Sequence, residues 1–167
     1  MGIVYDSEKG ELRIHGIRFA ATDVREFCKR LDLLVGPTVA RVQMHSIEAL
    51  QGKNDVEIIR KEDPNATMKE IVDALVEMDS ASGLGVTRVS SSDNYSNPIS
   101  IETSNPLVVA LVGAASAFQT AWWCGAMSAL LGKPLDVANI VYDNERNVLR
   151  FQLVTRKGYD VGKVQSR

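Results

Sequence analysis

Apolar and polar residues are distributed unevenly along this chain. Segment 103–132 contains thirty residues without one charged side chain, whereas 24% of all residues are charged. About twenty apolar residues can cross a bilayer, so a membrane span is one interpretation of this segment. Asn105-Pro106 near its start, Gly113 in its middle, two strand patterns after it and the lack of a flanking basic cluster favour a buried helix of a globular domain instead.

The boundaries of this central helix follow from local signals. Ser116 precedes Gln119 by three positions, which is the spacing of a capping box, and predicts a start near Ala117. Gly132 can adopt the left-handed conformation that ends many helices, so the predicted last residue is Leu131. A helix that is apolar on nearly all sides is expected to be surrounded by other elements.

Residues four positions apart share one face of a helix, which divides the central helix into rows of different character. One row consists of small residues and would let another backbone approach closely: Ala117, Ala121, Gly125 and Ala129. Two rows are bulky and would fill or line the space opposite: Phe118, Trp122, Ala126 and Leu130, and Gln119, Trp123, Met127 and Leu131. The last row is small and mildly polar: Thr120, Cys124 and Ser128.

The remaining pattern predicts an α+β fold, with helices packed on one side of a four-stranded antiparallel sheet, a buried central helix and an N-terminal hairpin. We expect one domain over 1–156 and a flexible tail over 157–167, while the charged stretch 53–65 is interpreted as a solvated connection. The other predicted elements are a hairpin over 3–18, helices over 22–36 and 37–52, a helix after the Thr67–Glu70 capping box, and strands over 86–90, 98–103, 135–142 and 147–155. The second helix is predicted to begin at Pro37, to end at Gly52 and to bury Val39, Ala40, Met44, Ile47 and Leu50.

Composition and charge narrow the function classes. A net charge of −2 and a pI of about 5.7 give no electrostatic case for binding nucleic acid or an anionic membrane. Cys28 and Cys124 belong to no metal-binding motif, and we expect a reduced, cytoplasmic protein without a cofactor. His45 is predicted to be a satisfied helix histidine or else a polar ligand contact, and His15 to face water. No catalytic triad or dinucleotide fingerprint is readable, so an enzyme is the least favoured class.

Three short motifs carry a family resemblance: Gly83-Leu-Gly85 before a strand, Asn105-Pro106 before the central helix, and 124–132 followed by a hairpin containing Leu149-Arg-Phe151. With the order of elements over about residues 20–156, they resemble the 4-vinyl-reductase domain, whose fold is shared with trafficking subunits of the TRAPP tethering complexes. The resemblance implies a small, often dimeric domain whose central helix and sheet enclose a hydrophobic pocket. Some members are sensory halves of aromatic-responsive regulators, and others are free-standing archaeal and bacterial proteins.

The resemblance also implies candidate site residues and one departure. Sensory members usually hold zinc with cysteines of the last hairpin, but Val141 and Leu149 occupy the corresponding positions here, so we expect no metal. Cys124 matches a family cysteine that accepts an acyl chain in some trafficking members, although it can equally be an inert buried thiol. The residues expected to line an apolar pocket are Phe118, Trp122, Trp123 and Met127 of the central helix, with Met44 and Ile47 of the second helix.

Two function hypotheses result. The first is a carrier or sensory domain, a homodimer, that holds an apolar, aromatic or hydrocarbon-like molecule beside the central helix. The second is a non-catalytic assembly subunit in which the same small and bulky rows serve packing within or between subunits. For each pocket residue, plain core packing is the alternative, because aromatic and Met side chains at helical spacing commonly lie in cores.

Overall fold

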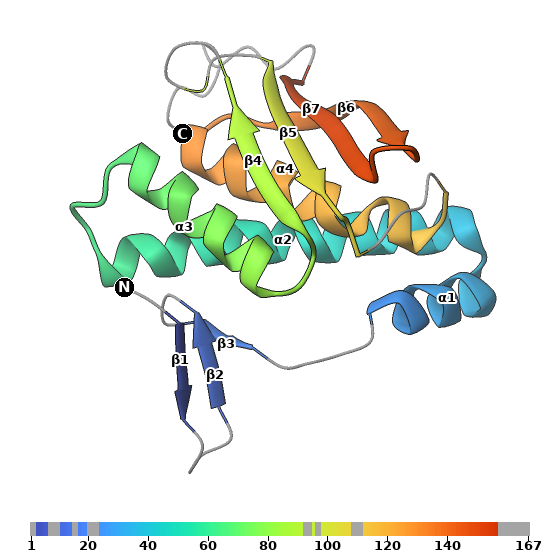
Figure 1. The fold of residues 1–167 in the computed structure, drawn as a ribbon, viewed down its shortest axis with the longest axis horizontal. Coiled ribbons are helices and arrows are strands. Elements are labelled where there is room, and N and C mark those ends of the chain that lie inside the picture. The colour runs from blue at the N-terminus through green and yellow to red at the C-terminus, as the bar shows by residue number, and fades with distance from the viewer. Residues whose placement is uncertain are drawn as a thin grey trace, which may run out of the picture.

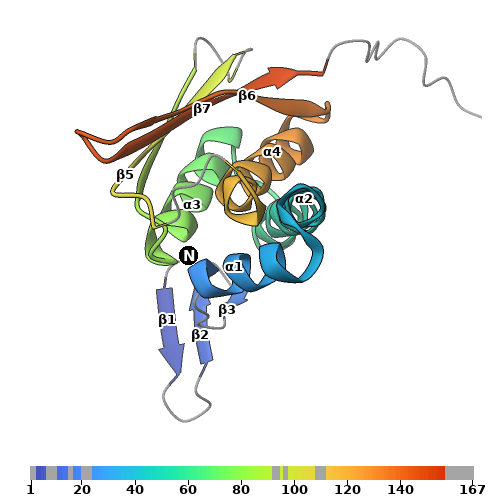
Figure 2. The same cartoon turned by 90° about the vertical axis from the view of Figure 1, so that its right-hand side faces the viewer.

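A four-stranded antiparallel sheet curves over a group of helices in this computed structural model, which describes residues 3–6, 11–14, 17–19, 24–91, 95, 98–107 and 112–156 (Figures 1 and 2). The predicted α+β fold is confirmed. The elements, in chain order, are β1 (Ile3–Asp6), β2 (Glu11–Ile14), β3 (Ile17–Phe19), α1 (Val24–Val35), α2 (Pro37–Glu62), α3 (Met68–Ala81), β4 (Val86–Ser90), β5 (Ile99–Ser104), the 3-10 helix η2 (Ala114–Ser116), α4 (Phe118–Leu131), β6 (Leu135–Asp143) and β7 (Val148–Thr155).

The sheet has the order β4-β5-β7-β6, and every neighbouring pair is antiparallel. In Figure 2, α3 and α4 lie directly beneath its concave face, α2 lies on the side of α4 away from the sheet, and α1 lies beyond α2. Along β5, buried residues alternate with partly exposed ones, as expected for a sheet with one covered face. The main core lies between this face and the helices.

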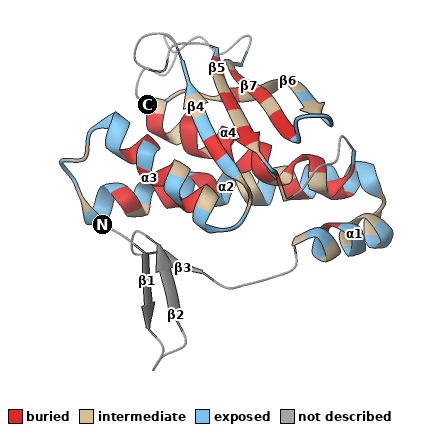
Figure 3. Cartoon of the chain, in the orientation of Figure 1, coloured by how far each residue is buried: buried red, intermediate tan, exposed pale blue. Residues whose placement is uncertain are grey.

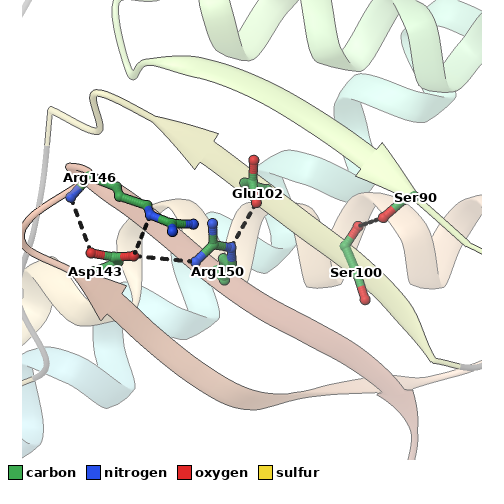
Figure 4. Close-up of polar contacts among 6 residues, drawn as sticks. All are labelled: Ser90, Ser100, Glu102, Asp143, Arg146 and Arg150. Carbon is green, nitrogen blue, oxygen red and sulfur yellow. Dashed lines mark hydrogen bonds and ion pairs between the residues drawn. The ribbon is translucent and has the colours of Figure 1, made fainter.

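The other face of the sheet carries polar pairs (Figure 4). Arg150 Nε lies 2.7 Å from Glu102 Oε2, and its Nη1 lies 3.7 Å from Asp143 Oδ2. These groups are partly exposed, so such pairs contribute little stability each. The central helix is covered by the sheet on one side and contacts α2 on the other.

The N-terminal segment forms three strands, where a two-stranded hairpin was predicted. β1 pairs with β2, as expected, but residues 11–18 do not form one strand: β2 ends at Ile14 and β3 begins at Ile17, and β2 and β3 are antiparallel neighbours in a three-stranded sheet. His15 and the predicted tail 157–167 lie outside the described residues, so their predicted exposure and flexibility stay predictions.

The second helix does not end at Gly52, and this prediction is wrong. α2 continues to Glu62, because Gly52 serves close packing inside the helix. A Cβ atom at Gly52 would lie 2.1 Å from the carbonyl oxygen of Trp122, and one at Gly125 would lie 1.9 Å from that of Ala49. The small row of the central helix thus contacts α2 within the same chain. The stretch 53–62 is helical, with Asp55, Val56 and Ile59 buried, and is not a solvated connection.

The start of the central helix also differs in mechanism from the prediction. Ser116 lies in η2 and donates to the Gly113 carbonyl oxygen at 2.7 Å, while the Gln119 side chain points into the interior, so these two residues form no capping box. The predicted end is confirmed, since Gly132 caps α4 with a φ of 64°. The Thr67–Glu70 capping box of α3 is confirmed as well.

One side of α2 is unexpectedly exposed. Figure 3 colours parts of α2 as exposed. Ala40 and Met44 are buried as predicted, but the prediction that Val39, Ile47 and Leu50 are buried is wrong, since their exposed fractions are 48%, 55% and 58%. The reason is helix geometry, because these residues lie opposite the face that α4 covers. We call the exposed set on α2 the outer apolar stripe: Val39, Val42, Ile47 and Leu50.

No helix among the described residues combines the length and apolarity that a bilayer crossing requires. α4 itself has 14 residues, which is too short for a span of about 20 residues.

Candidate functional site

The two adjacent tryptophans of α4 point to different sides of the helix. Trp122 Nε1 donates to Asp55 Oδ2 of α2 at 2.7 Å, and Trp123 Nε1 donates to Asp79 Oδ2 of α3 at 3.1 Å. Their rings contact edge to face, with centroids 5.1 Å apart. An indole N–H inside a protein normally needs an acceptor, and each of these has a buried carboxylate.

A buried polar group, which we call the Asp79 cluster, joins α3, β4, β5 and α4. Asp79 Oδ2 accepts from the Thr87 hydroxyl and, at 2.7 Å, from Gln119 Nε2, in addition to Trp123. Gln119 Nε2 also lies 3.1 Å from Thr103 Oγ1. Burial raises the pKa of Asp79, while the hydrogen bonds from Thr87, Gln119 and Trp123 act in the opposite direction. Asp79 Oδ1 is buried and has no hydrogen-bond partner among the described residues.

Asp55 lies on the opposite side of α4 and is 2% exposed. Gln51 Nε2 donates to its Oδ1 at 2.7 Å, so each carboxylate oxygen has one donor. Burial raises its pKa, and the hydrogen bonds from Trp122 and Gln51 oppose this. Burial and then the charge of Asp55 raise the pKa of Glu48, seven positions earlier on the same helix, to about 7.

A cavity of about 360 Å³ opens beside α4, between α2 and the start of β6, and we call it the α4 cavity. Its apolar wall is made of small side chains, and its charged lining residues come from α2, from the loop after α4 and from the residue after β7. The lining residues are His45, Ala49, Lys53, Cys124, Gly125, Ser128, Ala129, Gly132, Lys133, Pro134, Leu135 and Arg156.

The Cys124 thiol is part of this wall. It is 4% exposed and donates to the Leu135 carbonyl oxygen at 3.1 Å. Burial, and then the charge of Asp136, raise its pKa to about 11, so the thiol is protonated at neutral pH. A protonated, buried thiol behaves as a small apolar group and is a poor nucleophile.

The structure does not bring all the predicted pocket residues to this cavity. Cys124 lines it. Met44, Trp123 and Met127 are fully buried, Trp122 is 9% exposed, and Phe118 is partly buried against a second, smaller core formed with α1 and η2. Ile47 lies on the outer apolar stripe and does not line the cavity, so the prediction that it faces the interior is wrong. A ligand contact for the buried residues stays a prediction.

Sequence reasoning missed the charged part of the lining. Lys53 was assigned to a solvated connection, while Lys133 and Arg156 follow the ends of α4 and β7. His45 was considered as a helix residue or a polar ligand contact, and it lines the cavity. A basic residue placed just after an element is a weak signal, because such positions are commonly solvated.

Among the described residues, no group of three or more His, Cys, Asp or Glu side chains is arranged to hold a metal ion. At the two hairpin positions singled out in the sequence, Val141 is 54% exposed and Leu149 is buried.

Comparisons with known proteins give a similarity in fold. No protein-family model matches the chain, and no curated protein matches it in sequence. Among solved structures, the chain is similar to the phenol-responsive sensory domain of the transcription activator PoxR, whose crystal structure was determined with phenol. The TM-score is 0.75 at 12% sequence identity, and the match covers 95% of this chain and 87% of that one.

Proposed function

We propose that this protein is a small-molecule-binding domain, of carrier or sensory type, that holds its ligand in the α4 cavity. The observation that carries this proposal is the cavity itself. Its volume of about 360 Å³ falls within the roughly 300–1,000 Å³ of ligand pockets in proteins. Small residues such as Gly125 and Ala129 provide the apolar wall, and a few polar groups stand at its edge, as is usual for such pockets.

The fold supports the proposal. The similar PoxR domain is phenol-responsive, and its structure was determined with phenol. Together with the sequence motifs, this likeness favours membership in the 4-vinyl-reductase domain family.

A binding role suits the cavity better than a catalytic one. The Cys124 thiol in the wall is protonated and donates a hydrogen bond to a backbone carbonyl. It therefore serves as a wall of the cavity.

The test combines native mass spectrometry of the freshly purified protein with ligand-observed NMR against a panel of aromatic and aliphatic molecules. Ala129→Phe should fill the cavity and weaken binding at least tenfold, because Ala129 lines the wall. Ala81→Phe, at an exposed position of α3, is the matched control and should bind as the parent protein does. Equal binding by both folded variants would place the ligand elsewhere, and no binding by the parent protein would refute the proposal.

A second candidate function, assembly with a second copy of the chain, is favoured by the outer apolar stripe. Val42 and Leu50 are 63% and 58% exposed, and on α1 Leu33 and Leu34 are 78% and 80% exposed. Contiguous exposed apolar residues commonly mark protein interfaces. Light scattering after size exclusion should show a dimer that Leu50→Lys converts to a monomer. A parent protein that stays monomeric at high concentration would contradict the assembly role.

A further inference from the structure

The edge of the α4 cavity carries positive charge from three separate parts of the chain. Lys53 comes from α2, Lys133 follows α4, and Arg156 follows β7. Among the described residues, no Asp or Glu lines the cavity. The cations therefore converge on the cavity.

Two of these three cations form ion pairs with carboxylates among the described residues, and the third does not. Lys53 Nζ lies 3.6 Å from Glu57, and Arg156 Nη2 lies 2.8 Å from Asp136. Lys133 makes no ion pair or side-chain hydrogen bond with any described residue. Exposed pairs such as Lys53 with Glu57 contribute little stability, so the cations can turn to a ligand at low cost. Three cations against two carboxylates match a ligand with a single negative charge.

Two other sources of negative charge near the cavity are already neutralised. The Cys124 thiol is protonated at neutral pH. The C-terminus of α4 carries a partial negative charge, but two of its carbonyl groups are engaged: Leu130 O accepts from Arg60 at 3.1 Å, and Ser128 O accepts from the amides of Gly132 and Lys133. A bound anion would thus meet the cations without direct competition from these groups.

From this arrangement we propose that the α4 cavity binds an organic carboxylate with a compact apolar body. The apolar body lies on the wall formed by Gly125, Ala129 and Leu135, and the carboxylate faces Lys133 and Arg156. Charge-assisted hydrogen bonds to an ammonium and a guanidinium group hold a carboxylate well. This inference rests on the proposed function, and it replaces the purely apolar ligand expected from the sequence with an anionic one.

The test compares carboxylates with their neutral amides of nearly equal shape, using benzoate with benzamide and octanoate with octanamide. Titration calorimetry and ligand-observed NMR at low ionic strength should show at least tenfold tighter binding of the better carboxylate than of its amide. The difference should narrow as salt is added, because the cations are partly exposed. Preference for benzoate or for octanoate then distinguishes an aromatic from an aliphatic acid.

Lys133→Met should weaken carboxylate binding about tenfold and leave amide binding unchanged. Lys133→Gln is a second neutral variant should the first not fold, and Lys61→Met, at an exposed position of α2 away from the cavity, is the control. If amides bind as tightly as carboxylates, the charge preference is refuted while the cavity remains a binding site. Equal weakening of carboxylate binding by Lys61→Met would also refute the charge preference. If no member of either pair binds, both this inference and the proposed function are overturned.

Discussion

Trp122 and Trp123 are neighbours in sequence, yet each donates its indole N–H to a buried aspartate on a different side of α4. On the α2 side, Asp55 has one donor for each oxygen, and the second donor is Gln51 of its own helix. On the sheet side, Asp79 receives three donors on Oδ2 and none on Oδ1 within the described part of the chain. In both pairs an indole N–H donates to a buried carboxylate. The pairs differ in whether both oxygens of that carboxylate accept a hydrogen bond.

This difference follows from what surrounds the central helix. The α2 side is a close contact between two helices, so a donor one turn away on α2 can reach Asp55. On the sheet side, Asp79 meets residues from β4, β5 and α4, which converge from far apart in sequence. Buried carboxylates need such donors, because burying a charge without a partner is costly. Asp55, whose second donor is local, has a donor for each oxygen. Asp79, whose donors come from distant segments, has one oxygen without a donor among the described residues.

Breaking the α2 side should have the largest effect. Gly52→Val places side-chain atoms against the Trp122 backbone, since even a Cβ would lie 2.1 Å from its carbonyl oxygen. We expect a loss of about 3 kcal/mol or more in the free energy of unfolding, because backbone of two packed helices must move apart. Urea unfolding followed by circular dichroism measures it.

The matched control is Ser46→Val on the exposed side of the same helix, which should change stability by less than about 0.5 kcal/mol. If Gly52→Val were as stable as the control, the close contact of α2 and α4 would not be what holds this side of the molecule together.

Gly52 also shows where the sequence was sufficient and where it was not. A glycine after an apolar stretch is typical of a helix end, because glycine inside a helix costs about 1 kcal/mol relative to alanine. Here tertiary packing outweighs that cost. The spacing of Val56 and Ile59 continues the apolar face of α2 and was the available signal that the helix goes on.

Other features were predictable because their cause is local. The end of α4 at Gly132, the capping box of Thr67 and the four main strands follow from short-range patterns. The positive charge of the α4 cavity was not predictable, because Lys53, Lys133 and Arg156 meet only when three distant segments fold together. The same holds for Gln119, whose spacing from Ser116 suited a cap but whose side chain reaches Asp79 at 2.7 Å.

Replacing each aspartate by asparagine should change the free energy of unfolding differently at Asp55 and at Asp79. In Asp55→Asn, the amide oxygen still accepts from Trp122, and the new NH2 group can donate to Gln51 once that side-chain amide turns over. A buried charge is removed and no group is left unpaired, so the free energy of unfolding should change by less than about 0.5 kcal/mol or rise.

In Asp79→Asn, the NH2 group takes the place of Oδ1, which is buried and has no hydrogen-bond partner among the described residues. We expect a loss of about 2 kcal/mol, the usual cost of an unsatisfied buried donor. Urea unfolding of the two variants side by side at neutral pH gives the comparison. Equal losses of stability in the two variants would contradict a difference between the two sides of α4.

A smaller effect than that of Asp79→Asn should come from Glu48, the second carboxylate on the α2 side. Its pKa rises from 4.5 to about 7 on folding, because of burial and then the charge of Asp55. The folded state thus holds a proton that the unfolded state releases, so the contribution of Glu48 is fully present below pH 4.5 and is lost as the pH rises toward 7. Relative to Glu48→Gln, the parent protein should lose about 1 to 2 kcal/mol of stability between pH 5 and 8, less than the full shift implies because the carboxyl is partly exposed. Glu145→Gln, in the exposed turn between β6 and β7, should leave this pH dependence unchanged. If the stabilities of the parent protein and of Glu48→Gln changed with pH in parallel, Glu48 would not have a raised pKa in the folded state.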